Sequence, residues 1–258
     1  MSGMKRVVVT GGASGIGFAC AEVLRAEGWS VVLADVNADL LQARAAQIGA
    51  EAAVLDVSDP DATEALAARL ADSGGVQGLV ASAGVLQRPV APHELSMAEW
   101  DHVMNIDLRG VYISCRAFGT RMARAGTGAI VTISSGAGML STPMHSYGPA
   151  KAGVISLTQS LAAEWGRSGV RVNGVAPGFT LTEAVKARLA TSERDISGFE
   201  RDQVIGRALE PVEIARPVAF LLSDAASAIT GTTLPVDGGI IANGVWPSYG
   251  GLRGKYSD

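Results

Sequence analysis

The sequence has 258 residues, of which 48% are hydrophobic and 18% charged, so it is long enough for one α/β domain and apolar enough to suggest subunit contacts. A net charge of -4 without a Lys/Arg cluster argues against nucleic acid or an anionic membrane as the main partner and favours a small molecule. No signal core and no run of about 18 apolar residues are present, so we expect a cytoplasmic protein whose Cys20 and Cys115 are buried, reduced thiols.

Short β-branched runs alternate along the chain with longer segments rich in Ala, Leu, Glu and Arg. The runs predict strands at 6–10, 30–34, 52–55, 78–82, 129–133 and 170–175, and the longer segments predict helices at 16–28, 38–48, 60–72, 97–125 and 145–166. Runs such as Val7-Val8-Val9 are continuously apolar, as in strands covered on both faces. We therefore predict a single Rossmann-type domain over 1–258, a doubly wound parallel sheet of about seven strands with helices on both faces.

One region breaks this alternation. Residues 183–210 are charged and helix-prone, and they lie between Pro177-Gly178 and a helix-like segment that begins at Pro211. Long irregular connections near a ligand site commonly close over it. We expect this region to be a mobile lid.

A glycine-rich turn, Thr10-Gly-Gly-Ala-Ser-Gly-Ile-Gly17, follows the first predicted strand and opens the first helix. At this position Gly11, Gly15 and Gly17 would allow a tight turn, close approach of a pyrophosphate to backbone N–H groups, and packing of helix on sheet. Ser14 and Ile16 belong to the same predicted phosphate cradle. The alternative is a plain strand–helix turn.

Acidic residues follow the second and third predicted strands. Asp35 lies 18 residues after Gly17, the distance at which a carboxylate reaches the adenosine ribose hydroxyls, and no basic residue near it could offset a 2′-phosphate. This favours NAD over NADP, although Asp35 could simply cap the next helix. Asp56 and Val57 could recognise the adenine edge, or Asp56 could belong to a helix start.

Tyr147 and Lys151 are four residues apart, which on a helix puts both side chains on one face. A nearby ammonium stabilises the phenolate form of a tyrosine, so Tyr147 could exchange a proton with a substrate near neutral pH. Pro149 is tolerated only in the first turn of a helix, which predicts that Tyr147 lies at the helix start.

Taken together, these motifs resemble the short-chain dehydrogenases/reductases in their form of roughly 250 residues, over about residues 5–240. The resemblance also rests on Ala83-Gly84, Ile133-Ser-Ser135, Arg171-Val-Asn173, Pro177-Gly178 and Ile229-Thr-Gly231 through Gly239. It implies hydride transfer between a nicotinamide and a carbinol or carbonyl carbon, with Tyr147 as acid/base and Lys151 as its activator and ribose ligand. The cofactor site it implies comprises Gly11, Ser14, Gly15, Ile16, Gly17, Asp35, Asp56, Val57, Ala83, Gly84, Tyr147, Lys151, Pro177, Gly178, Thr180 and Thr182.

The resemblance also implies a catalytic serine that orients the substrate oxygen toward Tyr147. Alignment of Ser135-Gly-Ala-Gly138 with the Ser-x-x-Gly pattern of the family selects Ser135, whereas the commoner spacing to Tyr147 selects Ser134. We predict Ser135 and keep Ser134 as the alternative.

The sequence departs from the family at two places. The catalytic Asn of the family, which binds a water in a proton relay behind the lysine, falls on Asp107, and nearby Asn105 would serve only if the helix were locally shifted. We predict Asp107 as the fourth catalytic residue. The other departure is Ala81-Ser82, where the family usually has two Asn residues that tie neighbouring strands, a role that Ser82 could take in part.

The resemblance favours an NAD-dependent enzyme acting on a secondary alcohol such as a polyol, sugar or hydroxy acid, with no metal, and a homotetramer. The alternatives are an NADPH-dependent 3-oxoacyl or other ketoreductase, and a catalytically silent NAD-binding regulator. Residues 240–258 extend past the usual family end and include Trp246, which favours a tail packed across a subunit interface.

Overall fold

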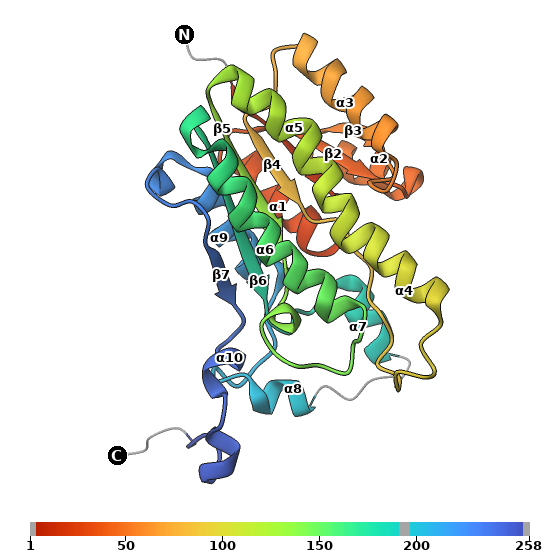
Figure 1. Cartoon of the computed structure of the whole chain (residues 1–258), viewed down its shortest axis with the longest axis vertical. Helices are drawn as coiled ribbons and strands as arrows, with labels where there is room; N and C mark the ends of the chain where they lie inside the picture. Colours follow the sequence, from red (N-terminus) through yellow and green to blue (C-terminus); the bar gives the residue numbers. More distant parts are fainter. Residues whose placement is uncertain (1–3, 191–196, 255–258) are drawn as a thin grey trace.

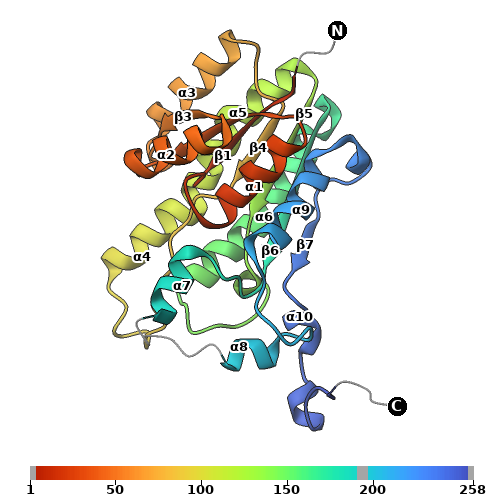
Figure 2. The ribbon, with the colours of Figure 1, turned by 180° about the vertical axis from the view of Figure 1, so that it is seen from behind.

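The computed structural model describes residues 4–190 and 197–254, and in them seven parallel strands form a sheet of order β3-β2-β1-β4-β5-β6-β7 (Figures 1 and 2). The strands are β1 (Arg6–Thr10), β2 (Ser30–Asp35), β3 (Glu51–Val54), β4 (Gly78–Ala81), β5 (Gly128–Ile133), β6 (Val170–Pro177) and β7 (Thr233–Val236). All six neighbouring pairs are parallel. The predicted doubly wound sheet is confirmed.

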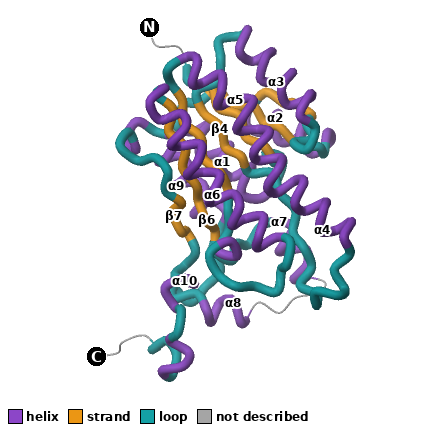
Figure 3. Tube along the Cα trace, in the orientation of Figure 1, coloured by secondary structure: helices purple, strands orange, loops and turns teal. Residues whose placement is uncertain are grey.

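Helices cover both faces of this sheet (Figure 3). The helices of the described ranges are α1 (Gly15–Ala26), α2 (Ala38–Ile48), α3 (Pro60–Asp72), α4 (Met97–Met104), α5 (Val111–Ala125), α6 (Tyr147–Trp165), α7 (Glu183–Ala190), α8 (Ser197–Asp202), α9 (Pro211–Leu222) and α10 (Ile240–Asn243), of which α7, α8 and α10 lie beyond the end of the sheet. Buried residues of α1, α2 and α9 share one hydrophobic core, and those of α3, α5 and α6 share the other.

Strand β1 shows why the sheet holds both layers together. Its residues Val7 and Val9 point into the first core, whereas Val8 points into the second, and all three are fully buried. Burying a valine side chain stabilises a fold by about 1.5–3 kcal/mol, so a continuously apolar strand contributes to both layers. Cys20 and Cys115 are free thiols, one in each core, and burial raises the pKa of each to about 12.

The predicted helix over 97–125 is interrupted by a π-helical turn at Asn105–Gly110, between α4 and α5. Such a turn accommodates one extra residue and is frequent at functional sites. The turn changes which side chains of this segment face α6, and both candidates for the relay position, Asp107 and Asn105, lie within it.

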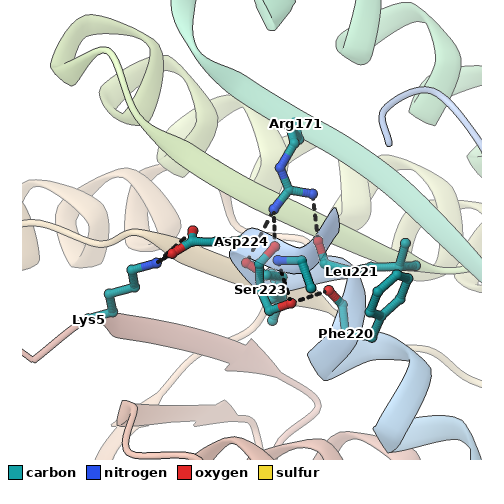
Figure 4. A network of polar contacts seen from close by, with 8 residues as sticks. Lys5, Arg171, Phe220, Leu221, Ser223 and Asp224 are labelled. Atoms are coloured by element: carbon teal, nitrogen blue, oxygen red, sulfur yellow. Dashed lines mark hydrogen bonds and ion pairs between the residues drawn. The ribbon is translucent and has the colours of Figure 1, made fainter. Parts of the chain in front are cut away.

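Arg171 of β6 holds the end of α9 in place (Figure 4). Its guanidinium donates hydrogen bonds of 2.7, 3.3 and 2.9 Å to the carbonyl oxygens of Leu221, Leu222 and Ser223. The final carbonyls of a helix lack partners within it, and a cation there also complements the helix dipole. The next residue, Asp224, pairs with Lys5 at 2.9 Å, so the start of β1 is tied to the same corner.

The last part of the chain lies at the same end of the molecule as the carboxyl ends of the strands. Helices α7 and α8 belong to the predicted lid, of which residues 191–196 lie outside the described residues. The tail, with α10 and a short turn at Trp246–Tyr249, projects from the body (Figure 1), and the Trp246 side chain is 47% exposed. None of the helices in the described ranges has the length and apolar character to cross a membrane.

Candidate active site

The candidate site lies at the carboxyl ends of β1 and β4, where the strand order changes direction. Strands β1 and β4 are neighbours in the sheet although two other strands separate them in the sequence. In doubly wound sheets the loops that leave such a pair diverge and open a crevice for a ligand. The glycine turn follows β1 at this crevice, as predicted.

The glycine turn has the backbone that a phosphate cradle requires. Gly11 and Gly15 adopt φ of 63° and 54°, and a Cβ at Gly11 would lie 2.8 Å from the Cα of Ala83. A Cβ at Gly17 would overlap the Gly11 carbonyl oxygen. Ser14, at the N-cap of α1, is exposed and makes no side-chain cap, so the first N–H groups of the helix are not satisfied by its hydroxyl. These residues fit a pyrophosphate group.

Thr10 ties β1 to β4 at the point where the family usually has asparagine. Its hydroxyl oxygen accepts hydrogen bonds from the N–H groups of Ser82 at 3.1 Å and Ala83 at 3.3 Å. The hydroxyl of Ser82 itself lies beside Gly17. Thr10 therefore takes the strand-tying role that we had expected Ser82 to share.

Asp35 ends β2 beside the glycine turn, as predicted. One carboxylate oxygen accepts from the N–H of Ala13 at 3.1 Å and the other accepts from the N–H of Asn37 at 3.0 Å. Asn37, not Asp35, caps α2, through a bond from the N–H of Leu40. The capping alternative for Asp35 is therefore wrong, and its carboxylate lies beside the glycine turn.

Asp56 and Val57 lie just beyond β3, which spans Glu51–Val54 rather than the predicted 52–55. The exposed carboxylate of Asp56 accepts from the N–H of Ser58 at 2.8 Å, and hydrogen bonds from Ser58 lower its pKa. Val57 is buried against Gly110. Asp56 and Val57 thus belong to a turn at the edge of the sheet, and the buried side chain of Val57 holds this turn in place.

Tyr147 is the first residue of α6, and Lys151 follows one turn later on the same side. The Lys151 Nζ lies 5.5 Å from the centre of the Tyr147 ring and donates to the Ile133 carbonyl at 3.2 Å. Burial alone would lower the pKa of Lys151, but the nearby charges, above all that of Asp107, outweigh burial and raise it. Lys151 is therefore a stable ammonium beneath a half-buried tyrosine.

Asp107, and not Asn105, faces Lys151. The Asp107 Oδ2 lies 3.1 Å from the Lys151 Nζ, and its Oδ1 accepts from the N–H of Val85 at 2.8 Å. Asn105 instead accepts from Arg109 at 3.0 Å on the other side of the π-helical turn. Gly84 is required at this point, because a Cβ there would lie 2.9 Å from Asp107 Oδ2.

The two serines after β5 differ in environment. Ser134 is buried and its hydroxyl donates to the Lys151 carbonyl at 2.9 Å, so it is committed to the packing of α6. Ser135 is half-buried and its hydroxyl oxygen accepts from the N–H of Ala137 at 3.1 Å, which leaves its proton free to point into the crevice. The geometry therefore favours Ser135.

The segment after β6 reaches back to the glycine turn. A Cβ on Gly178 would clash with the backbone of Asp237, and the hydroxyl of buried Thr180 donates to the Gly178 carbonyl at 3.1 Å. The Thr182 methyl lies 3.3 Å from the position of a Cβ on Gly15. Thr182 is thus placed beside the predicted phosphate cradle, whereas Thr180 stabilises its own loop.

Two features of the site were missed at the level of the sequence. Gln87 is 2% exposed and contacts the start of α6, and Arg44 of α2 stacks on the ring of Phe18 and pairs with Glu183 of α7. Contacts between residues 59 and 139 positions apart leave no local pattern. A buried glutamine in a loop cannot be distinguished from a solvated one by spacing alone.

With this geometry in place, the chain can be assigned to a family. A family model described as Enoyl-(Acyl carrier protein) reductase matches residues 11–241. A Cis-4-hydroxycyclohexanecarboxylate dehydrogenase from Sinomonas cyclohexanicum is 43% identical over 91% of this chain and 96% of its own length. The chain belongs to the short-chain dehydrogenase/reductase family.

Two solved structures extend the comparison. A Brucella melitensis 16M protein described as ribose-5-phosphate isomerase is 48% identical, with a TM-score of 0.95 over 98% of each chain. A Beutenbergia cavernae protein assigned as an NAD(P)-dependent gluconate 5-dehydrogenase, which holds NADP at low occupancy, is 35% identical, with a TM-score of 0.87 over 94% of this chain and 98% of its own. The family relationship makes this protein an oxidoreductase that acts on alcohol groups.

Proposed function

We propose that the protein is an NAD-dependent dehydrogenase that interconverts a secondary alcohol and its ketone. The observation that carries the proposal is the buried Lys151 ammonium, which lies beneath Tyr147 and is held by Asp107 beside Gly84. A permanent positive charge below a phenol stabilises the phenolate that a general base needs. A purely structural buried lysine would also need the carboxylate of Asp107, but not a tyrosine over its ammonium.

In the proposed mechanism, each residue of the site has a role that follows from its position. Ser135 donates a hydrogen bond to the substrate oxygen and orients it toward Tyr147, which takes the hydroxyl proton during oxidation or returns it during reduction. Lys151 stabilises the phenolate and would hold the nicotinamide ribose, and Asp107 lies behind it at the position where the family has its relay asparagine. The nicotinamide, when bound, supplies the acceptor or donor of hydride.

Asp35 is the reason for preferring NAD. Its carboxylate is held by the N–H groups of Ala13 and Asn37, so it cannot swing away from a ribose placed over the glycine turn. A 2′-phosphate at that position would meet a fixed negative charge. The remaining cofactor contacts in the proposal are Ser14, Ile16, Gly178 and Thr182.

Hydroxy acids, sugars and polyols are the proposed substrates. The proteins from Sinomonas and Beutenbergia are named for hydroxylated carboxylic acids. The candidate pocket wall around Leu86 and Leu140 is apolar and exposed, and Glu183 and Lys186 of α7 supply charge at the lid. This combination suits a polar alcohol whose carbon skeleton rests on an apolar wall.

The assembly is proposed to be a homotetramer. The face of α5 and α6 presents Tyr112, 45% exposed, beside Leu108 and Leu157, and the tail presents Trp246. Exposed apolar groups of this size mark contact surfaces. Sedimentation of a monomer would contradict both the tetramer and the interface role of the tail.

The experiment that tests the function follows the absorbance of reduced nicotinamide with NAD+ or NADP+ and a panel of polyols, sugars, hydroxy acids and hydroxysteroids. We expect NAD+-dependent oxidation that Tyr147→Phe lowers by at least about 100-fold. Full activity in Tyr147→Phe would overturn the mechanism. A preference for NADP+ would favour the ketoreductase alternative, and cofactor binding without turnover would favour the silent regulator.

A further inference from the structure

Helix α6, which carries Tyr147, begins without a cap from its own sequence. Ser146 occupies the N-cap position in a helical conformation and makes no side-chain cap. The first N–H groups of a helix have no partners within it, and leaving them unsatisfied when buried is unfavourable. The N–H of Gly148 donates to the Met144 carbonyl at 2.9 Å and Pro149 has no N–H, so the groups that need a partner from elsewhere in the fold are the N–H of Tyr147 and that of fully buried Ser146.

Gln87, in the loop that follows β4, provides that partner. Its Oε1 accepts from the N–H of Ser146 at 2.7 Å, from the Ser146 hydroxyl at 2.9 Å and, at a longer 3.4 Å, from the N–H of Tyr147. Its Nε2 donates to the Arg88 carbonyl at 3.0 Å, which fixes the orientation of the amide. One buried side-chain oxygen therefore collects three donors at the start of α6.

The loop that contains Gln87 is also held by Asp107, which contacts Lys151. Two residues before Gln87, the N–H of Val85 donates to Asp107, whose other oxygen contacts Lys151. The loop from Val85 to Gln87 thus joins Asp107 to Tyr147 by a route separate from α6 itself. A displacement of this loop would move Tyr147 relative to Lys151.

We propose that Gln87 is a positioning residue that sets the location of Tyr147 by capping α6 from the loop after β4. The proposal deepens the proposed function, because it concerns the same acid/base. In this arrangement Gln87 contributes an acceptor without a charge. The Lys151 ammonium lies 5.5 Å from the centre of the Tyr147 ring, with Asp107 behind it. His145 directly precedes Ser146, and Arg88, which pairs with Glu99 at 3.7 Å, directly follows Gln87.

Two substitutions distinguish the role of Gln87 as a hydrogen-bond acceptor from the effect of a charge at that position. Gln87→Leu keeps most of the volume but removes the acceptor, so kcat for alcohol oxidation should fall by at least about 10-fold at every pH, because reacting groups misplaced by about 1 Å cost as much as 100-fold. Gln87→Glu keeps an acceptor for the same donors but adds a negative charge near Tyr147, which opposes phenolate formation. Its activity should be low near pH 7 and recover toward the wild-type value roughly one pH unit higher.

Measurements without substrate distinguish failure of this proposal from failure of the proposed function. Amide hydrogen exchange at Ser146 and Tyr147 should speed up by at least about 10-fold in Gln87→Leu and stay near wild type in Gln87→Glu, while NADH affinity changes less than twofold in both. If the wild-type protein oxidises nothing in the panel, the exchange rates alone decide the positioning role. Unchanged exchange in Gln87→Leu, or equal activity losses in both variants at every pH, would overturn it.

Discussion

The Lys151 ammonium and the Asp107 carboxylate form a contact of 3.1 Å between two side chains that are 4% and 0% exposed. A buried pair of this kind is costly to break, because the remaining charge has no partner. The contact also offsets the positive charge that Lys151 presents to Tyr147. Stability and proton transfer therefore depend on Asp107 in opposite directions.

Asp107→Asn should show both effects. The amide oxygen still accepts from the Val85 N–H, but Lys151 loses its counter-charge, so the free energy of unfolding should fall by about 3 kcal/mol in urea titrations. The uncompensated ammonium favours phenolate, so the pH at which alcohol oxidation reaches half its maximal rate should decrease. Asn105→Ala is the matched control, and an equal shift in that variant would contradict the assignment of Asp107.

Asp35→Asn should relax the preference for NAD. The amide oxygen keeps a hydrogen-bond acceptor near Ala13 but removes the charge opposed to a 2′-phosphate, so the ratio of kcat/KM for NADP+ to that for NAD+ should rise at least about 10-fold. Steady-state kinetics with both cofactors measure this ratio. Asp39→Asn in the first turn of α2 is the control. An unchanged ratio in Asp35→Asn would show that selection lies elsewhere.

The Arg44–Glu183 pair should help to hold cofactor. Glu183 begins α7 directly after Thr182, which lies against the Gly15 turn, and Arg44 is fixed by stacking on Phe18 at 4.5 Å. The pair is partly exposed and contributes at most about 1 kcal/mol, so Glu183→Gln should weaken NADH binding about two- to fivefold in fluorescence titrations. The exchanged pair Arg44→Glu/Glu183→Arg should recover part of this affinity. Glu51→Gln, which breaks the remote pair with Arg69, should leave the affinity unchanged.

Arg171→Met should destabilise the fold without changing cofactor affinity. The substitution keeps the aliphatic stem but removes the three bonds to the end of α9, at a cost of about 2 kcal/mol in the free energy of unfolding. Arg69→Met, at an exposed ion pair, should cost less than about 1 kcal/mol in the same denaturation assay. Equal losses in the two variants would refute the capping role of Arg171.

Glu213 should contribute stability that depends on pH. Hydrogen bonds from Arg207 and from the N–H of Glu210 lower its pKa from 4.5 to about 2 in the folded chain. A lowered carboxyl pKa stabilises the fold above pH 4.5, and this contribution disappears as the pH falls toward 2. Glu213→Gln should therefore cost about 1 kcal/mol at pH 7 and less at pH 3, and Arg207→Gln should remove most of the difference.

The sheet and the placement of Tyr147 beside Lys151 could be predicted because their signals are local. Continuously apolar strands, the glycine turn and the spacing of Tyr147 and Lys151 each depend on residues close together in the sequence. The third strand was predicted to end at Leu55 but ends at Val54, because β3 stops where its pairing with β2 stops. The choice between Asp107 and Asn105 depended on a π-helical turn, which no periodic pattern in 97–125 indicated.

The π-helical turn at Asn105–Gly110 has a further consequence for how the chain can change. One additional residue in a helix turns every later side chain by about 100° about the helix axis. The side chains of α5 therefore point in directions offset from those that a regular continuation of α4 would give. Deleting one residue from the turn would make α4 and α5 one regular α-helix. Either Asp107 or the buried face of α5 would then turn away from its contacts. The length of the turn is therefore not free to vary, because it fixes the direction of Asp107 relative to the buried face of α5.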